Sequence, residues 1–151
     1  MKISFALSKL TILFLLSSLI VMNCSKDDSP SGQIVGSWKF TNIYVKEGTK
    51  AESDQFLTLA SQLPCVKEIV FIFKKSGDVT ATTSADCQST ANIFVGSAGS
   101  GKYEVTDNKL IITDKTSTTF DITFSGKTMT WKLATVNGAV TTTTRFVFAK
   151  Q

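Results

Sequence analysis

Apolar and polar residues alternate with a period of two along most of the chain after Ile34. The alternation begins at Gly36-Ser37-Trp38-Lys39-Phe40, where a glycine is followed by two large aromatic residues at alternate positions. A period of two places successive side chains on opposite faces of a β-strand. We therefore expect a first strand over residues 35–46, with the later strands packed against Trp38. One face of this strand would present Gly36, Trp38, Phe40 and Tyr44.

The same pattern predicts seven further strands, most of them joined by short turns. Residues 51–63 differ, because their apolar side chains have helical spacing and the segment ends at Pro64, which predicts one short helix after the first strand. Eight strands in a row favour an all-β fold, an antiparallel up-and-down barrel, because closure at eight strands leaves no exposed edge. The predicted strands cover residues 35–46, 67–74, 78–85, 102–107, 109–113, 118–124, 129–133 and 139–149.

The N-terminal segment is instead a continuous apolar run, from Leu10 to Met22, preceded by Lys2 and Lys9. The run is shorter than the ~20 residues of a membrane-spanning helix, so it predicts a signal peptide over residues 1–23. It ends at Cys24, which indicates lipoprotein processing. The Cys24 thiol would receive a diacylglyceryl group and the freed amine a further acyl chain such as palmitate, and several acyl chains hold a protein firmly on a bilayer. A plain signal peptide followed by an incidental cysteine is the alternative.

Residues 24–33 have the composition of a flexible, acidic tether. Ser25-Lys26-Asp27-Asp28 resembles the surface-export signal of Bacteroidota lipoproteins, in which acidic residues follow the lipidated cysteine. The resemblance implies a lipid-anchored protein on the outer face of the outer membrane, whereas a solvated charge run is the alternative for the two aspartates. Ser29-Pro30-Ser31-Gly32-Gln33 is typical of a linker. The predicted organisation is a signal peptide (1–23), a tether (24–33) and a barrel domain (34–151).

Cys65 and Cys87 lie at matching distances from one predicted hairpin. Lys75-Ser76-Gly77 fits a three-residue turn with its glycine in the left-handed position. Lys74 then pairs with Asp78, and paired residue numbers sum to 152, as do those of the two cysteines. In an exported chain this register predicts a disulfide. Two free thiols, one of them a catalytic nucleophile, are the alternative, but the chain has no histidine to activate a thiol.

Composition and charge argue against several functional classes. The net charge of +4 falls to about +2 when Lys2 and Lys9 are removed, which is too weak and scattered to favour nucleic acid as a partner. The chain lacks histidine, the usual general base near neutral pH and the commonest transition-metal ligand. Its acidic residues are also dispersed. We therefore expect no enzymatic activity, no metal site and no cofactor.

One glycine-rich stretch, Gly96-Ser97-Ala98-Gly99-Ser100-Gly101-Lys102, has the spacing of a phosphate-binding loop. Such a loop continues with Ser or Thr and then a helix. Here Tyr103 follows, and the next residues alternate as in a strand. We interpret the stretch as a flexible loop that leads into a strand.

Four short features together resemble the lipocalin-like domains of Bacteroidota lipoproteins, within the wider lipocalin (calycin) architecture. They are Gly36-x-Trp38, the pair Cys65 and Cys87, Gly101-x-Tyr103, and Arg145, the only arginine in the chain. The resemblance covers residues 34–151 and implies that Gly36, Trp38 and Arg145 close the barrel floor, with the guanidinium packed across the indole. Such stacking contributes about 1–2 kcal/mol when it is partly desolvated.

Two functions stay open from the sequence. The first is a barrel that binds a small apolar ligand, as the resemblance implies. Its candidate ligand-binding residues are Phe40, Phe71, Phe73, Tyr103, Phe120, Phe124, Met129 and Trp131. The second is a filled barrel displayed at the cell surface as a structural or interaction module, in which Thr141–Thr144 and the loops contact a protein or glycan partner. The same aromatic residues would then fill the interior, which in an eight-stranded barrel is just wide enough for side chains.

Overall fold

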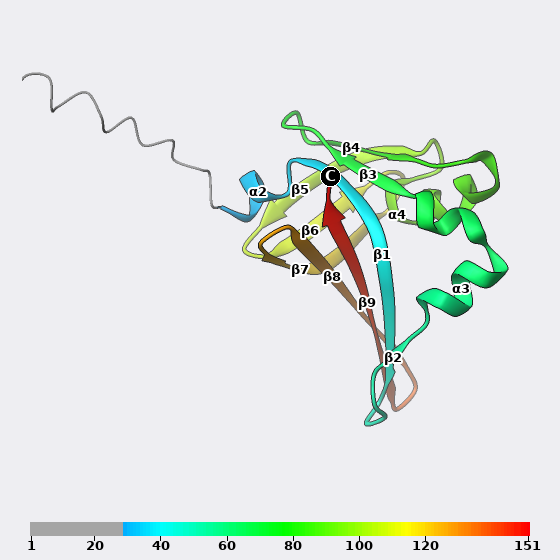
Figure 1. The fold of residues 1–151 in the computed structure, drawn as a ribbon. Coiled ribbons are helices and arrows are strands. Elements are labelled where there is room, and N and C mark those ends of the chain that lie inside the picture. The colour runs from blue at the N-terminus through cyan, green and yellow to red at the C-terminus, as the bar shows by residue number, and fades with distance from the viewer. Residues whose placement is uncertain (1–28) are drawn as a thin grey trace, which may run out of the picture.

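In the computed structural model, which describes residues 29–151, tight turns join most pairs of neighbouring strands. One hairpin joins β3 (Val70–Phe73) to β4 (Asp78–Thr82), and the next joins β5 (Ser100–Thr106) to β6 (Lys109–Thr113). Further turns connect β7 (Ser117–Ser125), β8 (Thr128–Asn137) and β9 (Val140–Lys150). β1 (Gly36–Glu47) pairs with both β3 and β9, so these strands and β4 to β8 close into the predicted eight-stranded antiparallel barrel (Figure 1).

The register of the first hairpin confirms the sequence prediction, although its strands are shorter than predicted. Val70 pairs with Thr82, and the Lys74 N–H donates to the Asp78 carbonyl at 2.8 Å. Before β3 the chain forms a 3₁₀ helix, η2 (Pro64–Glu68), because proline presets the first helical φ angle. A second 3₁₀ helix, η3 (Ala85–Cys87), follows β4. Strand pairing therefore ends before it reaches the two cysteines.

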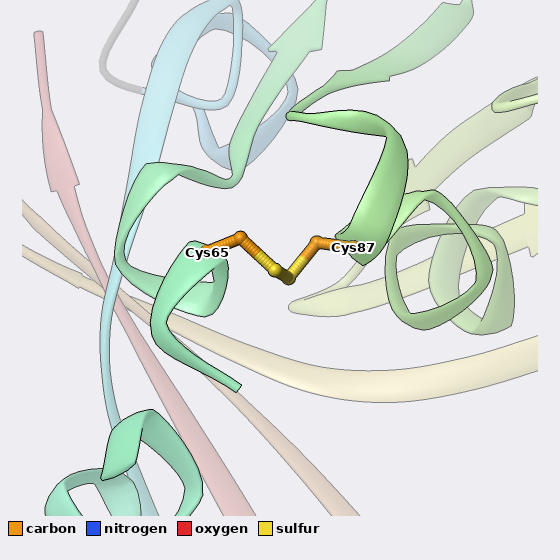
Figure 2. Close-up of a disulfide and its surroundings, with 2 residues drawn as sticks. All are labelled: Cys65 and Cys87. Atoms are coloured by element: carbon orange, nitrogen blue, oxygen red, sulfur yellow. A yellow bond between two sulfur atoms is a disulfide. The ribbon is translucent and has the colours of Figure 1, made fainter. Parts of the chain in front are cut away.

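Cys65 and Cys87 nevertheless form the predicted disulfide. The bond joins η2 to η3, with the two Cα atoms 5.8 Å apart (Figure 2). Extending the register of the hairpin correctly predicted that the two cysteines face each other, even though they lie in 3₁₀ helices and not in strands.

Three short helices and one two-residue strand complete the structure. α2 (Pro30–Gln33) is formed by the last residues of the predicted tether, and β2 (Ser53–Asp54) pairs with β1. The predicted helix over residues 51–63 is confined to α3 (Phe56–Gln62), because the residues before it form this strand and a turn. α4 (Gln88–Val95) was not predicted; it buries Ala91 and Val95.

Gly101 allows α4 to lie close to the sheet. A Cβ atom at this position would stand 2.6 Å from the Val95 carbonyl oxygen and 3.0 Å from that of Thr113. Both neighbours are backbone atoms, which cannot rotate away. This close approach gives a physical reason for the glycine in Gly101-x-Tyr103. Gly101 was predicted to belong to a flexible loop, but it lies within β5.

A β-bulge at Thr41 changes which side chains of β1 face the core. Phe40 pairs with Phe148, but Asn42 pairs with Val147, so one extra residue lies between the two pairs. An extra residue inverts the inward and outward alternation. Ile43 accordingly packs against the core and Tyr44 lies outside it. The prediction that Tyr44 shares the face of Trp38 is therefore wrong.

Candidate functional site

The barrel interior is filled by its own aromatic side chains. Trp131 is fully buried, and its ring centroid lies 4.3 Å from that of Phe148, 5.2 Å from Phe120 and 5.5 Å from Phe71. Six of the eight predicted ligand-binding residues belong to this core, each no more than 4% exposed. They are Phe40, Phe71, Phe73, Phe120, Met129 and Trp131. The structure thus brings these six together as a packed core.

The two tryptophans of the core differ in how their indole N–H groups are satisfied. Trp38 Nε1 donates to the Ile34 carbonyl at 2.6 Å. Trp131 Nε1 is buried and has no hydrogen-bond partner among residues 29–151. A buried donor without a partner costs about 1–3 kcal/mol of stability, so the core contains an unsatisfied indole N–H at Trp131. The sequence pattern does not reveal this cost.

At one end of the barrel, α4 covers the core with Phe94. Its ring centroid lies 5.0 Å from that of Phe146 and 5.7 Å from that of Phe71. The helix is held at both ends: the disulfide precedes it, and the Asp114 carboxylate accepts a 3.0 Å hydrogen bond from the Ser97 N–H just beyond it. That backbone hydrogen bond lowers the pKa of Asp114. A cleft of about 450 Å³ lies between α4 and the strands β6 and β7, lined in part by Phe94.

The opposite end of the barrel, beside α2, has a larger open cleft of about 1300 Å³. We call it the α2 cleft and define its apolar floor as Trp38, Tyr103, Val105 and Phe124. The ring centroids of Trp38 and Phe124 are 5.9 Å apart. The remaining two predicted ligand-binding residues, Tyr103 and Phe124, are therefore here, half-buried, rather than in the closed interior.

The polar atoms of this floor are already engaged within the protein. The Tyr103 hydroxyl donates to the Lys74 carbonyl at 2.8 Å. Burial, and then the nearby Asp78 carboxylate, raise the pKa of Tyr103, so its phenol is neutral at physiological pH. Because the Trp38 N–H is also bonded, the floor offers mainly apolar surface to a ligand.

Three lysines surround the α2 cleft, and we call them the lysine rim: Lys75, Lys127 and Lys150. Lys150 lies closest to the floor. Its Nζ donates to the Gln33 carbonyl at 3.2 Å and stands 5.1 Å from the centroid of the Trp38 ring. Sequence reasoning did not identify these lysines, because they come from two turns and the last strand, and only the folded barrel brings them together.

The predicted packing of Arg145 across Trp38 is wrong. Arg145 pairs with Tyr44 in the sheet, six residues along β1 from Trp38, or roughly 20 Å at the usual rise of a strand. The Arg145 guanidinium lies 4.0 Å from the Tyr44 ring centroid, and its Nε donates to Glu52 at 2.9 Å. The cation over Trp38 is Lys150, whose register position is opposite that tryptophan. Gly36, with a φ angle of +126°, and Trp38 do begin β1 at this end.

The predictions for the signal peptide, for lipidation of Cys24 and for the export signal Lys26, Asp27 and Asp28 fall outside the described residues. Within residues 29–151, no helix is long and apolar enough to span a membrane. In the same part of the chain, no three His, Cys, Asp or Glu side chains are grouped so that they could hold a metal ion.

Comparison with known proteins gives one match. The family model described as lipocalin-like domain matches residues 34–131, from two residues before β1 to the middle of β8. No curated protein and no solved structure gives a significant match. The matched region contains every residue of the α2 cleft floor.

Proposed function

Because the chain belongs to the lipocalin-like domain family, whose members are usually non-enzymatic binders, we propose that it is a lipid-anchored lipoprotein of the cell envelope that binds a small apolar ligand. The ligand site in this proposal is the α2 cleft. The observation that carries it is the apolar floor formed by Trp38, Tyr103, Val105 and Phe124 in an open cleft of about 1300 Å³. Ligand pockets are usually concave, apolar and several hundred Å³ or more in volume.

The choice of the cleft over the interior follows from packing. The interior residues contact one another, and a ligand there would have to displace aromatic side chains from a core as dense as an organic crystal. At the α2 end Tyr103, Val105 and Phe124 are only partly buried, so a ligand can cover their exposed surface without that cost. Covering about 100 Å² of apolar surface contributes about 2.5 kcal/mol.

The membrane anchor is the second part of the proposal, and its support is the sequence around Cys24. Pro30 is the sixth residue after Cys24, and six residues of fully extended chain span about 20 Å. An acylated Cys24 would therefore keep the α2 end close to a bilayer. The likeness of Lys26, Asp27 and Asp28 to a surface-export signal supports the outer face of the outer membrane as the location.

The anchor is tested in cells that express the full chain. We expect the wild-type protein to incorporate radiolabelled palmitate, to partition with membranes, and to be digested by a protease added to intact cells. The variant Cys24→Ser should lose both the label and the membrane association. If that variant keeps the label, lipidation at Cys24 is wrong; if the wild type is labelled but resists the protease, the surface location alone is wrong.

The ligand site is tested with the chain that begins at Ser25, since the buried core lies entirely between Ile34 and Phe148. The neutral probe N-phenyl-1-naphthylamine should bind and gain fluorescence. Val105→Trp, which places an indole over the apolar floor, should weaken binding, while Ile111→Trp on the neighbouring strand should not. Native mass spectrometry of protein purified from its own envelope should show added mass that is lost on denaturation.

A filled barrel that acts as an interaction module is the second candidate, and the packed interior favours it. In that case the probe would not bind, or Val105→Trp and Ile111→Trp would bind it equally well. The native mass would equal the denatured mass. The surface to examine for a protein or glycan partner would then be the threonine run Thr141–Thr144 on β9.

A further inference from the structure

The lysine rim is a cluster of cations that form no ion pair among residues 29–151. Among residues 29–151, the side-chain ion pairs use Lys50, Lys102, Lys109 and Arg145. Lys75, Lys127 and Lys150 take part in none of them. The one acidic residue that lines the α2 cleft is Glu104. Three lysines and one glutamate leave this lining with a net charge of +2.

Three separate segments supply the rim. Lys75 belongs to the turn between β3 and β4, Lys127 to the turn between β7 and β8, and Lys150 to the end of β9. Solvated lysines on a protein with a small net charge are normally mixed with acidic residues. Here three lysines surround the mouth of one cleft, and the one cation in contact with the floor, Lys150, lies over Trp38.

The floor and the rim together select one kind of molecule. The floor buries apolar surface and has its Trp38 and Tyr103 donors already bonded, so it suits a hydrocarbon chain. The rim supplies positive charge at the edge of that surface, where an acidic head group would stand. A neutral apolar molecule would use the floor and leave the lysines unpaired.

We propose that the α2 cleft binds an amphipathic anion, a molecule with a hydrocarbon chain on the apolar floor and an acidic head group between Lys75, Lys127 and Lys150. This inference rests on the proposed function and narrows the ligand class of the same site. The acidic head can come from a free acid, such as a fatty acid, or from an anionic membrane lipid.

The decisive comparison is between decanoate and decanol, which share a chain and differ in the charge of the head. Both are measured by displacement of N-phenyl-1-naphthylamine from the chain that begins at Ser25. We expect decanoate to bind at least about threefold more tightly in low salt, because each exposed ion pair contributes a few tenths of a kcal/mol to about 1 kcal/mol. The preference should shrink in 0.5 M NaCl, since salt screens exposed charges.

Variants assign the preference to the rim. Lys75→Gln combined with Lys127→Gln should remove most of the decanoate preference and leave decanol affinity unchanged. The two rim substitutions are also made singly, and the matched control for each is Lys67→Gln, which removes one exposed charge on η2, outside the cleft. Glu104→Gln should strengthen decanoate binding. Lys150 is left intact in the main variant, because its contacts with Gln33 and Trp38 also help to shape the cleft.

The outcomes separate this inference from the function on which it rests. If decanol binds as tightly as decanoate, or if Lys67→Gln weakens decanoate as much as the rim variant, the anionic head is wrong and the apolar ligand site stands. If the probe itself does not bind, both proposals fail, and if the probe binds but neither compound displaces it, the amphipathic anion is wrong. Sedimentation with vesicles decides the source: binding to vesicles that contain phosphatidylglycerol, competed by decanoate and lost in the rim variant, supports a membrane lipid. Decanoate binding without vesicle binding supports a free acid.

Discussion

Removing the disulfide tests how the α4 end of the barrel is held together. The bond between Cys65 and Cys87 closes a loop with a sequence separation of 22 residues. On the chain-entropy model, closing a loop of this length destabilises the unfolded chain by about 3 kcal/mol. Cys87 is fully buried. Alanine puts no polar group in its place, so replacing both residues removes only the covalent link and the two sulfur atoms.

We expect the variant Cys65→Ala/Cys87→Ala, made in the chain that begins at Ser25, to lose about 3 kcal/mol of unfolding free energy. Its Tm should fall by about 10 °C, given the size of the domain. Urea denaturation followed by tryptophan fluorescence is a suitable assay, because both tryptophans are buried. Dithiothreitol should lower the stability of the wild type to the same value and should leave the variant unchanged.

The reasoning would be refuted by a loss below about 1 kcal/mol, or by a variant that still responds to dithiothreitol. Amide exchange adds a local test. If the disulfide holds the helix against the sheet, exchange in Gln88–Val95 should increase more than exchange in the paired strands β8 and β9. Equal increases throughout would mean that the bond acts on the unfolded chain alone.

Three further substitutions test individual contacts, each by urea denaturation. Arg145→Met should lower the free energy of unfolding by about 1 kcal/mol at pH 7. Because the hydrogen bond from Arg145 lowers the pKa of Glu52, the ionic part of this stabilisation is present above the unfolded pKa near 4.3 and is lost as the pH falls through the lower folded pKa. An equal loss at pH 3 would contradict this account. Phe94→Ala should lower the free energy of unfolding by about 2 kcal/mol, because it leaves a cavity, whereas Ile93→Ala should change it little, because that side chain is 78% exposed. Equal losses would show that α4 does not cover the core through Phe94. Gly101→Ala should cost about 2 kcal/mol or more, because its Cβ would meet the last carbonyl of α4, and a neutral result would show that the helix can move away freely.

Turn residues in the sequence predicted the hairpins and, through the register of one hairpin, the disulfide. The turn Lys75–Gly77 fixes the pairing of β3 and β4, and that register continues arithmetically to Cys65 and Cys87. The prediction succeeded because strand pairing is periodic and short turns leave no freedom in register. It erred only in secondary structure, since the helical turn that begins at Pro64 extends to Glu68 and replaces the first residues of the strand expected over 67–74.

A single inserted residue explains why the predicted orientation of Tyr44 was wrong. The bulge at Thr41 shifts β1 by one position against β9, and nothing in the local sequence marks such an insertion. Tyr44 therefore faces outward, where Arg145 packs on it. The role expected of the arginine belongs to Lys150 instead, because register rather than residue type decides which cation lies over the indole.

The lysine rim and α4 could not be predicted for a different reason. The α4 signal is weak: Ala91 and Val95 have helical spacing and Gly96 follows, but eight residues are too few for the pattern to stand out. The rim depends on tertiary structure alone. Its lysines occupy turns and a strand end, positions where exposed lysine is ordinary, and their grouping appears only when the barrel closes.

The sequence alone left a hollow and a filled barrel equally open, and the side-chain volumes distinguish them. Eight strands enclose a space just wide enough for side chains, and here the inward positions hold Trp131, Phe71, Phe73, Phe120 and Phe148, which contact one another. Inward positions near the strand ends at the α2 side are different, because no further layer of side chains lies beyond them. Tyr103 and Phe124 therefore stay half-buried, and the four-residue α2 covers them only in part. A barrel filled along its axis still has an apolar surface at its end, so a packed core and a ligand site are compatible in this chain.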